Sequence, residues 1–325
     1  MSIFGNYLKG ISDMTLITSL LLIFKGSLEL GIIYAIMALG VFISFRTLNM
    51  PDLTVDSSFT LGAAFSAILC VSGHPVLGLI AAFIAGCAAG SITALLTTKL
   101  KIQPILSGIL MMLALYSINL KVMGNKSNIP LTKLLGIPTI FSPFDDTAIV
   151  DYIKLILPVV ILVLIMLLLY LFLKTKFGFV LRATGDNDKM VRALGVDTDL
   201  TTIIGLAISN GLVALSGALI AQYQAFTDLS MGIGMVVIGL ASVIIGEVIF
   251  GTGSLFRRLL AVVLGAVLYR FIIAIALELG MPSQDLKLVS AIIVTIALSL
   301  GIISNKVISL SGRQASLGKA KGGKQ

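Results

Sequence analysis

Charged residues are scarce in this sequence. Only 12% of its 325 residues are Asp, Glu, Lys or Arg, whereas roughly 25% are charged in an ordinary soluble domain. Hydrophobic residues make up 58%, and the mean hydropathy of the whole chain is +1.09. The apolar character is not confined to one segment, so a soluble enzyme with a single membrane anchor is excluded. The composition predicts a polytopic membrane protein.

Histidine and cysteine are too few to build a catalytic or metal centre. The one histidine, His74, lies between Gly73 and Pro75 in an expected turn, with no catalytic or metal-binding partners nearby. The two cysteines, Cys70 and Cys87, lie within apolar runs, so neither a disulfide nor a metal site is expected. The sequence therefore disfavours an intramembrane enzyme, and we expect no catalytic residues and no bound metal.

A nucleotide-binding loop is also missing. The pattern G-x-x-x-x-G-K-[ST] does not occur, and residues 251–254, GTGS, lack both its spacing and its lysine. This chain is therefore predicted to need no cofactor, and ATP with Mg²⁺ would be bound by another chain. The net charge of +8 does not indicate nucleic-acid binding, because the basic residues lie in loops between apolar runs.

Apolar runs long enough to cross a bilayer occur along most of the chain. Backbone groups within a bilayer must pair inside their own segment, so these runs are predicted to be helices. The fold class is therefore all-α, with about nine transmembrane helices in one permease domain over residues 1–308. Residues 14–24 are expected to form a short interfacial helix, and residues 309–325 a disordered basic tail. The nine predicted spans are 26–45, 53–71, 75–97, 104–122, 152–174, 201–223, 231–250, 256–279 and 285–304.

Basic residues in the loops predict the orientation. A cytoplasmic C-terminus puts 15 Lys and Arg residues on the cytoplasmic side and 7 on the other, in accord with the positive-inside rule. A weak internal repeat accompanies this topology: residues 51–54, PDLT, resemble residues 227–230, TDLS, at an offset of 176. Five predicted crossings separate the two copies, which predicts an inverted 4+4 repeat of the kind found in transporters.

The cytoplasmic loop 175–200 carries a short amphipathic pattern. Asp186 can cap a helix that runs to about Leu194, and Gly195 can end it. Met190 and Leu194 then share one face, as expected of a helix that docks into a groove on a partner protein. The alternative is a surface helix that lies against lipid headgroups.

This loop resembles the coupling loop of the permease subunits of ABC importers of the branched-chain amino acid and ribose type. The resemblance rests on Arg182-Ala183 followed by Ala193 and Gly195-Val196, and on the apolar stretch 238–251 after the loop. The D-L-T turn 52–54 is similar to sugar-type members, whereas residues 101–110 and 116–120 resemble a subgroup described as tryptophan and tyrosine permeases. Coupling positions implied by the resemblance and the loop pattern are Arg182, Ala183, Gly185, Asp186, Lys189, Met190, Arg192, Ala193, Leu194 and Gly195.

The resemblance also implies the partners. Such permeases work in pairs, each docked on an ABC ATPase subunit, while an extracytoplasmic binding protein delivers the solute. We therefore expect a multi-pass protein of the bacterial inner membrane that imports a small metabolite, in the first place an amino acid and an aromatic one if the subgroup holds. A homodimer is expected for the permease pair.

Polar residues at membrane depth are candidates for the solute path, because burying them in lipid is unfavourable. The carboxylates could line a water-filled path or could equally cap broken helices. Arg270, about 18 Å deeper than Arg258 at 1.5 Å per residue, could pair with an acid or contact a solute. The predicted path residues are Asp52, Thr54, Asp56, Ser57, Tyr116, Asn119, Asp228, Ser230 and Arg270.

The main alternative is an ion-coupled secondary transporter that acts without an ATPase. It would use Asp52, Asp56 or Asp228 as proton or sodium sites and would be sensitive to uncouplers.

Overall fold

The computed structural model describes residues 23–132, 136–144, 150–279, 281, 285, 288–292, 295 and 299. The predicted interfacial helix 14–24 and the basic tail 309–325 lie outside these residues, apart from residues 23 and 24. The last predicted span, 285–304, also lies largely outside them. The count of nine crossings therefore stays a prediction.

The all-α class is confirmed. Seven helices of the described residues are long and apolar enough to cross a membrane, and they account for seven of the predicted spans. They are Ile23–Thr47, α2 (Thr54–Val71), α3 (Pro75–Thr98), α4 (Pro104–Val122), α5 (Val150–Lys174), α8 (Thr198–Gln224) and α10 (Leu255–Glu278). The last six residues of the first helix, Phe42–Thr47, form the π-helical turn η1.

The predicted span 231–250 is only partly helical. Helix α9 covers Met235–Phe250, 16 residues, which is short of the roughly 20 residues that a full crossing requires. It begins directly after Gly234, whose φ of 90° lies in the left-handed region. Residues 229–234 instead form an irregular segment that leads to the start of α9.

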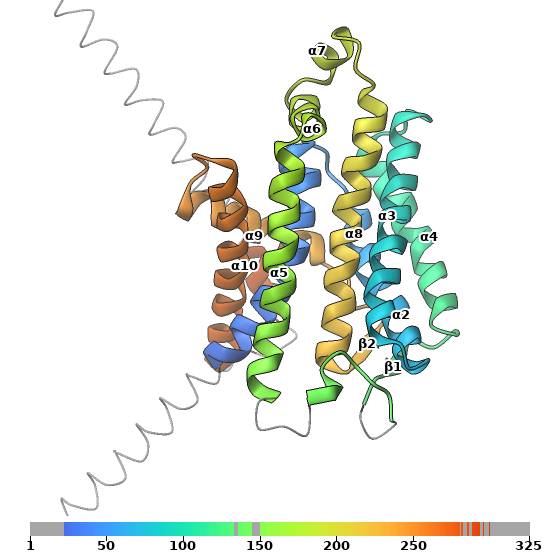
Figure 1. The fold of residues 1–325 in the computed structure, drawn as a ribbon, viewed down its shortest axis with the longest axis vertical. Helices are drawn as coiled ribbons and strands as arrows, with labels where there is room; N and C mark the ends of the chain where they lie inside the picture. Colours follow the sequence, from blue (N-terminus) through green and yellow to red (C-terminus); the bar gives the residue numbers. More distant parts are fainter. Residues whose placement is uncertain are drawn as a thin grey trace, which may run out of the picture.

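The two ends of the bundle differ in their secondary structure. Helices α6 (Lys176–Asp186) and α7 (Asp188–Ala193) lie at one end, and a two-stranded antiparallel sheet lies at the other (Figure 1). Strand β1 (Asn128–Pro130) pairs with β2 (Phe226–Asp228) in the register Asn128 to Asp228. This pairing joins positions almost 100 residues apart and was not predicted from the sequence. The 3-10 turn η3 (Ser142–Phe144) lies between the predicted spans 104–122 and 152–174.

Helix α8 is the centre of the packing. A Cβ added at Gly62 of α2 would lie 1.8 Å from the Ala214 carbonyl oxygen, and one added at Gly90 of α3 would lie 2.2 Å from the Leu206 carbonyl oxygen. Glycine at these positions lets the helix backbones touch. The hydroxyl of Ser209 on α8 also donates to the Gly40 carbonyl of the first helix at 2.7 Å.

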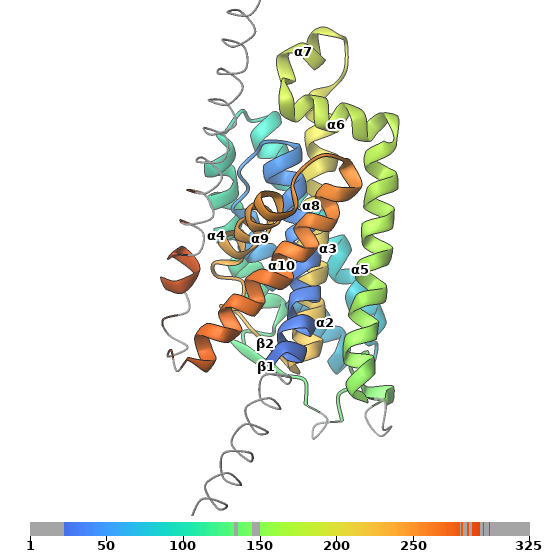
Figure 2. The ribbon, with the colours of Figure 1, turned by 90° about the vertical axis from the view of Figure 1, so that its left-hand side faces the viewer.

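Helices α2 and α9 start at a common depth and run in opposite directions. The Ser58 hydroxyl of α2 donates to Asn210 of α8, and the two helices run in the same direction. The start of α2, four residues before Ser58, therefore lies level with a point eight residues into α8, about 12 Å from its start at 1.5 Å per residue. The backbone N–H of Gly234, just before α9, bonds the Asp56 carboxylate of α2. From there α2 runs toward the β1–β2 end, while α9 returns toward the α6 end beside α10 (Figure 2).

Candidate functional site

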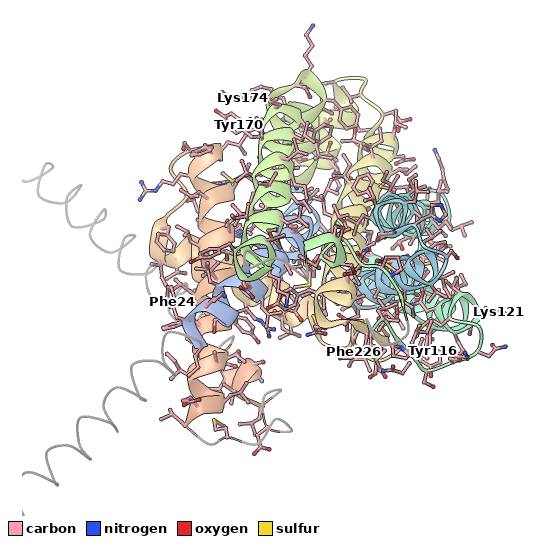
Figure 3. All side chains as sticks on the ribbon, turned by 60° about the horizontal axis from the view of Figure 1, so that its bottom comes forward. Phe24, Tyr116, Lys121, Tyr170, Lys174 and Phe226 are labelled. Atoms are coloured by element: carbon pink, nitrogen blue, oxygen red, sulfur yellow. The ribbon has the colours of Figure 1, made fainter. Side chains whose placement is uncertain are left out.

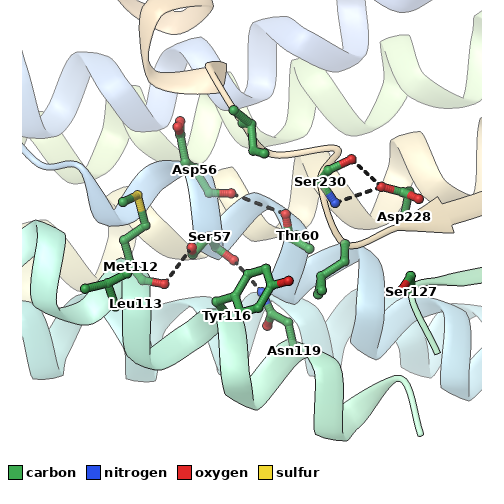
Figure 4. A pocket seen from close by; sticks show the side chains of 12 residues that line it. Asp56, Ser57, Thr60, Met112, Leu113, Tyr116, Asn119, Ser127, Asp228 and Ser230 are labelled. Carbon is green, nitrogen blue, oxygen red and sulfur yellow. Dashed lines mark hydrogen bonds between the residues drawn. The ribbon is translucent and has the colours of Figure 1, made fainter. Parts of the chain in front are cut away.

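A cavity lies where α2, α4 and the segment before α9 meet (Figure 4). Its volume is about 690 Å³, which lies within the range usual for small-molecule sites. Six of the nine predicted path residues line it, contributed by segments more than 100 residues apart. The lining consists of Asp56, Ser57, Thr60, Met112, Leu113, Tyr116, Asn119, Ser127, Asp228, Leu229, Ser230 and Ile233.

Asp56 uses its carboxylate to cap α9. Its Oδ2 accepts from the backbone N–H of Gly234 at 2.9 Å, and its Oδ1 accepts from that of Val236 at 2.8 Å. The first N–H groups of a helix have no partner within the helix and carry its positive dipole end, so a carboxylate is well suited to them. Asp56 thus joins the first turn of α2 to the start of α9.

Asn119 lines the cavity, and its side chain has a buried acceptor without a partner among the described residues. Its side chain is 1% exposed, and its Nδ2 donates to the Ser57 carbonyl oxygen at 3.1 Å. The Ser57 hydroxyl in turn donates to the Met112 carbonyl oxygen at 3.0 Å, which ties α2 to α4. Among the described residues, no group donates to Oδ1 of Asn119. Buried polar atoms normally have a hydrogen-bond partner, and a ligand in the cavity could supply one if a shift of the Asn119 side chain exposed this oxygen.

Asp228 provides the cavity with a charged group. It is the last residue of β2, and its Oδ1 accepts from the backbone N–H of Ser230 at 2.8 Å and from the Ser230 hydroxyl. These hydrogen bonds hold the pKa of the Asp228 carboxyl below its usual value, with the side-chain bond from Ser230 as the main cause. Asp228 is therefore ionised at neutral pH.

Asp52 and Thr54 lie apart from the cavity, in the buried interface of α2, α3 and α8. Asp52 is 1% exposed; its Oδ1 accepts from the Thr54 backbone N–H at 2.9 Å and its Oδ2 from Asn210 Nδ2 at 2.7 Å. The Thr54 hydroxyl lies 2.9 Å from that of Thr93. Every one of these polar groups is satisfied within the protein. Asp52 therefore holds the start of α2, and Thr54 joins α2 to α3, without a contact to the cavity. Asn210, at the centre of α8, was not singled out by the sequence.

Arg270 is also separate from the cavity. Its guanidinium lies 4.3 Å from the centroid of the Tyr34 ring, where a cation–π contact can partly compensate for burial. Tyr223 nearby donates to Glu29 Oε2 at 2.6 Å. Glu29 is only 5% exposed, and sequence reasoning missed it because one carboxylate in a long apolar helix gives no spacing pattern.

The predicted coupling residues form two short helices joined by Asn187 rather than one. Arg182, Ala183, Gly185 and Asp186 belong to α6, whereas Lys189, Met190, Arg192 and Ala193 belong to α7, with Leu194 and Gly195 in the turn that follows. The prediction that Asp186 caps the second helix was wrong, because Asp186 ends α6. Asn187 is the cap, and its side chain accepts from the Met190 backbone N–H at 3.1 Å.

The exposed apolar face of α7 agrees with the predicted docking role without testing it. Met190 is 53% and Leu194 73% exposed, which is unusual for large apolar side chains unless a partner or lipid covers them. Gly195 ends the turn with a φ of 83°. Gly185 serves packing, since a Cβ there would lie 1.9 Å from the Thr47 carbonyl oxygen.

Arg192 is held by its own chain. Its Nη2 donates to the Thr198 hydroxyl at 2.6 Å and to Asp199 Oδ1 at 2.9 Å, while Lys99 Nζ lies 3.3 Å from Asp199 Oδ2. Asp199 thus links α7 to the end of α3 and the start of α8. The sequence did not single out Asp199.

These observations describe a membrane transport subunit, and comparison with known families agrees. Residues 23–303 match the family described as "Branched-chain amino acid transport system / permease component". The chain belongs to this family. It is a membrane-spanning permease component of an ABC-type import system, so the predicted function is confirmed.

Individual relatives cover most of the chain. It is 42% identical to a tyrosine transport system permease protein of Clostridioides difficile over 88% of this chain and 93% of the relative. It is 35% identical to an uncharacterized protein of Rickettsia prowazekii over 84% and 95%. An autoinducer 2 import system permease protein of Salmonella typhimurium is 26% identical over 77% of this chain and 70% of the relative. No solved structure matches the chain.

Proposed function

We propose that this subunit imports an amino acid with an aromatic side chain, tyrosine in the first place, through the cavity beside Asp56 and Asp228. The observation that carries the proposal is the pairing of an ionised carboxylate with the unpartnered Oδ1 of Asn119. The α-ammonium group of an amino acid is a donor that suits both acceptors. The 42% identity to a tyrosine permease supports the same substrate class.

The apolar part of the cavity suits the side chain of such a solute. Met112, Leu113 and Tyr116 line one wall from α4, and Ile233 lies on the segment before α9. Aromatic rings pack favourably against one another and against methionine. In this arrangement the ammonium group lies near Asp228 and the ring near Tyr116.

We also propose that a separate ATPase drives transport through α6 and α7. The exposed Met190 and Leu194 would dock on the ATPase, and the α6–α7 end would then be cytoplasmic, which agrees with the basic residues of that end. A second permease subunit, in the simplest case an identical copy, and an extracytoplasmic binding protein would complete the assembly.

Reconstitution of the complete complex tests these proposals. Proteoliposomes that contain the permease, its ATPase and the loaded binding protein should accumulate labelled tyrosine only when ATP is supplied. Asp228→Asn should raise the KM for tyrosine about tenfold or more, because a charge-assisted hydrogen bond contributes roughly 1.5–3 kcal/mol. Asp228→Glu, which keeps the charge, should retain more of the affinity.

Two results would contradict the proposal. Uptake by the permease alone that needs no ATP and collapses with an uncoupler would favour the ion-coupled alternative, in which Asp56 or Asp228 binds the ion. ATP-driven transport of a solute that lacks an ammonium group, with no competition by tyrosine, would refute the substrate class but not the coupling.

A further inference from the structure

A second cavity, of about 320 Å³, lies near α6 and apart from the solute cavity. It is bounded by the end of the first helix, by α6 and by the turn that joins α9 to α10. Three arginines line it, Arg46, Arg182 and Arg258, together with the carboxylate of Asp186. Neither the family nor the proposed transport mechanism assigns a role to this cavity.

Two of these arginines have guanidinium N–H donors without an acceptor among the described residues. Arg182 Nε donates to the Gly178 carbonyl oxygen at 3.4 Å, and the guanidinium lies 4.5 Å from the centroid of the Phe179 ring. Arg258 Nε donates to the Thr252 carbonyl oxygen at 3.1 Å. Among the described residues, the terminal Nη groups of both side chains have no acceptor. Guanidinium groups fixed through Nε with open Nη donors suit the oxygens of a phosphate.

The charges of the cavity leave one positive charge to be matched. Arg46 is already paired, since its Nε and Nη2 donate to Glu247 Oε2 at 2.7 and 2.5 Å. Three guanidinium groups against the carboxylates of Glu247 and Asp186 give a net charge of 3 − 2 = +1. A phosphodiester carries one negative charge and would neutralise the site.

The cavity also lies at the depth of lipid headgroups. Phe256, in the first turn of α10, packs edge-to-face on Tyr170 at 5.7 Å, and Lys174 Nζ lies 4.5 Å from the Tyr170 ring centroid. Figure 3 shows Tyr170 and Lys174 at one end of α5. Tyrosine and lysine gather at the membrane–water boundary, and basic pockets between membrane helices bind anionic headgroups on the cytoplasmic side.

We propose that this cavity binds the phosphate of an anionic lipid headgroup, with Arg182 and Arg258 as the donors. The bound headgroup would hold α6, which precedes α7, against the end of the first helix and the α9–α10 turn. This site is independent of the solute, and it rests on the proposed cytoplasmic position of the α6–α7 end.

Native mass spectrometry of the full-length chain in mild detergent, titrated with phosphatidylglycerol, tests the proposal. The double variant R182Q/R258Q should bind this lipid about 25-fold more weakly, at about 5-fold for each arginine near the surface. Arg257→Gln is the matched control: Arg257 lies on the same turn but bonds the Phe250 carbonyl oxygen and does not line the cavity. It should bind like the wild type. Asp186→Asn should bind about 5-fold more tightly, which a general loss of folding cannot produce.

Four outcomes would overturn the proposal. The double variant could bind phosphatidylglycerol as tightly as the wild type, or Arg257→Gln could weaken binding as much as the double variant does. Binding of zwitterionic phosphatidylcholine at the same affinity would remove the role of net charge. Inorganic phosphate is titrated in parallel. If its binding depends on Arg182 and Arg258 and the binding of the lipid does not, free phosphate is the ligand and the lipid assignment is refuted.

Discussion

Asp56 and Asp228 line the same cavity, and their hydrogen bonds predict opposite consequences of substitution. The Asp56 carboxylate accepts two backbone N–H groups at the start of α9, at 2.9 and 2.8 Å. The Asp228 carboxylate accepts from the backbone N–H and the hydroxyl of Ser230, two residues further along the chain, and from the side chain of Asn128 on the neighbouring strand. We therefore expect Asp56→Asn to destabilise the fold and Asp228→Asn to impair solute binding with little effect on stability.

The magnitude for Asp56→Asn follows from its two bonds. Asparagine has one acceptor oxygen, so one N–H of the α9 terminus would face an NH₂ group and lose its partner, at about 1–3 kcal/mol. The lost negative charge at a helix N-terminus adds about 0.3–1 kcal/mol. The sum is about 1.3–4 kcal/mol. An unfolding entropy of about 2.1 cal/mol/K per residue, taken over 325 residues, converts this into a fall in Tm of roughly 2–6 °C.

Thermal unfolding of the purified protein in mild detergent measures the difference. Asp228→Asn should leave Tm within about 1 °C of the wild type, because Asp228 caps no helix and surface substitutions away from such features usually change stability by less than about 0.5 kcal/mol. A Tm of Asp56→Asn equal to that of the wild type would refute the role of Asp56 as the cap of α9. An equal fall in Tm in both variants would refute the assignment of a structural role to Asp56 and of a solute-binding role to Asp228.

Three further predictions concern packing, coupling and pH. Gly62→Ala should lower the stability by about 1–3 kcal/mol, because its Cβ would lie 1.8 Å from a carbonyl oxygen of α8, whereas Gly26→Ala, with nothing within 4 Å, should not lower Tm. Asp199→Arg should uncouple ATP hydrolysis from uptake, and Arg192→Asp in the same chain should partly restore the uptake per ATP hydrolysed; a double variant no better than the single would refute the pairing. Solute affinity that depends on Asp228 should stay constant from pH 7 to pH 5 and fall only below the ordinary carboxyl pKa of 3.8, because the pKa of this group is lowered; a titration of binding near pH 6 would contradict this.

Hydropathy was sufficient to predict most of the membrane helices. A long apolar run has one stable backbone arrangement in lipid, so α3, α4 and α5 begin within two residues of their predicted limits. Hydropathy alone began this span four residues before α9, because residues 231–234 belong to the same apolar run, although Gly232 and Gly234 predicted a break there. Their irregular conformation depends on Asp56, which lies about 180 residues away in the sequence.

The candidate site could be predicted in its residue types but not in its grouping. A polar side chain in an apolar run is visible in the sequence, and Asp56, Asn119 and Asp228 were found in this way. The sequence did not show that Asp52 lies apart from these residues. Asp52 bonds Asn210 on α8, 158 residues away, in a buried helix interface. Likewise, Asp186 and Asn187 are residue types with similar preference for the N-cap position, so the sequence alone does not show which of them caps α7.

The N-termini of α2 and α9 are both capped by carboxylates of this chain, which bears on the part of a solute that the cavity can bind. Broken membrane helices often direct free N–H groups at an anionic part of the substrate. Here Asp52 occupies the terminus of α2 and Asp56 that of α9, so both positive ends are neutralised within the protein. The cavity is left with acceptors, Asp228 and Asn119, and no basic side chain of the described residues lines it. This arrangement favours the ammonium end of the proposed amino-acid solute over its carboxylate.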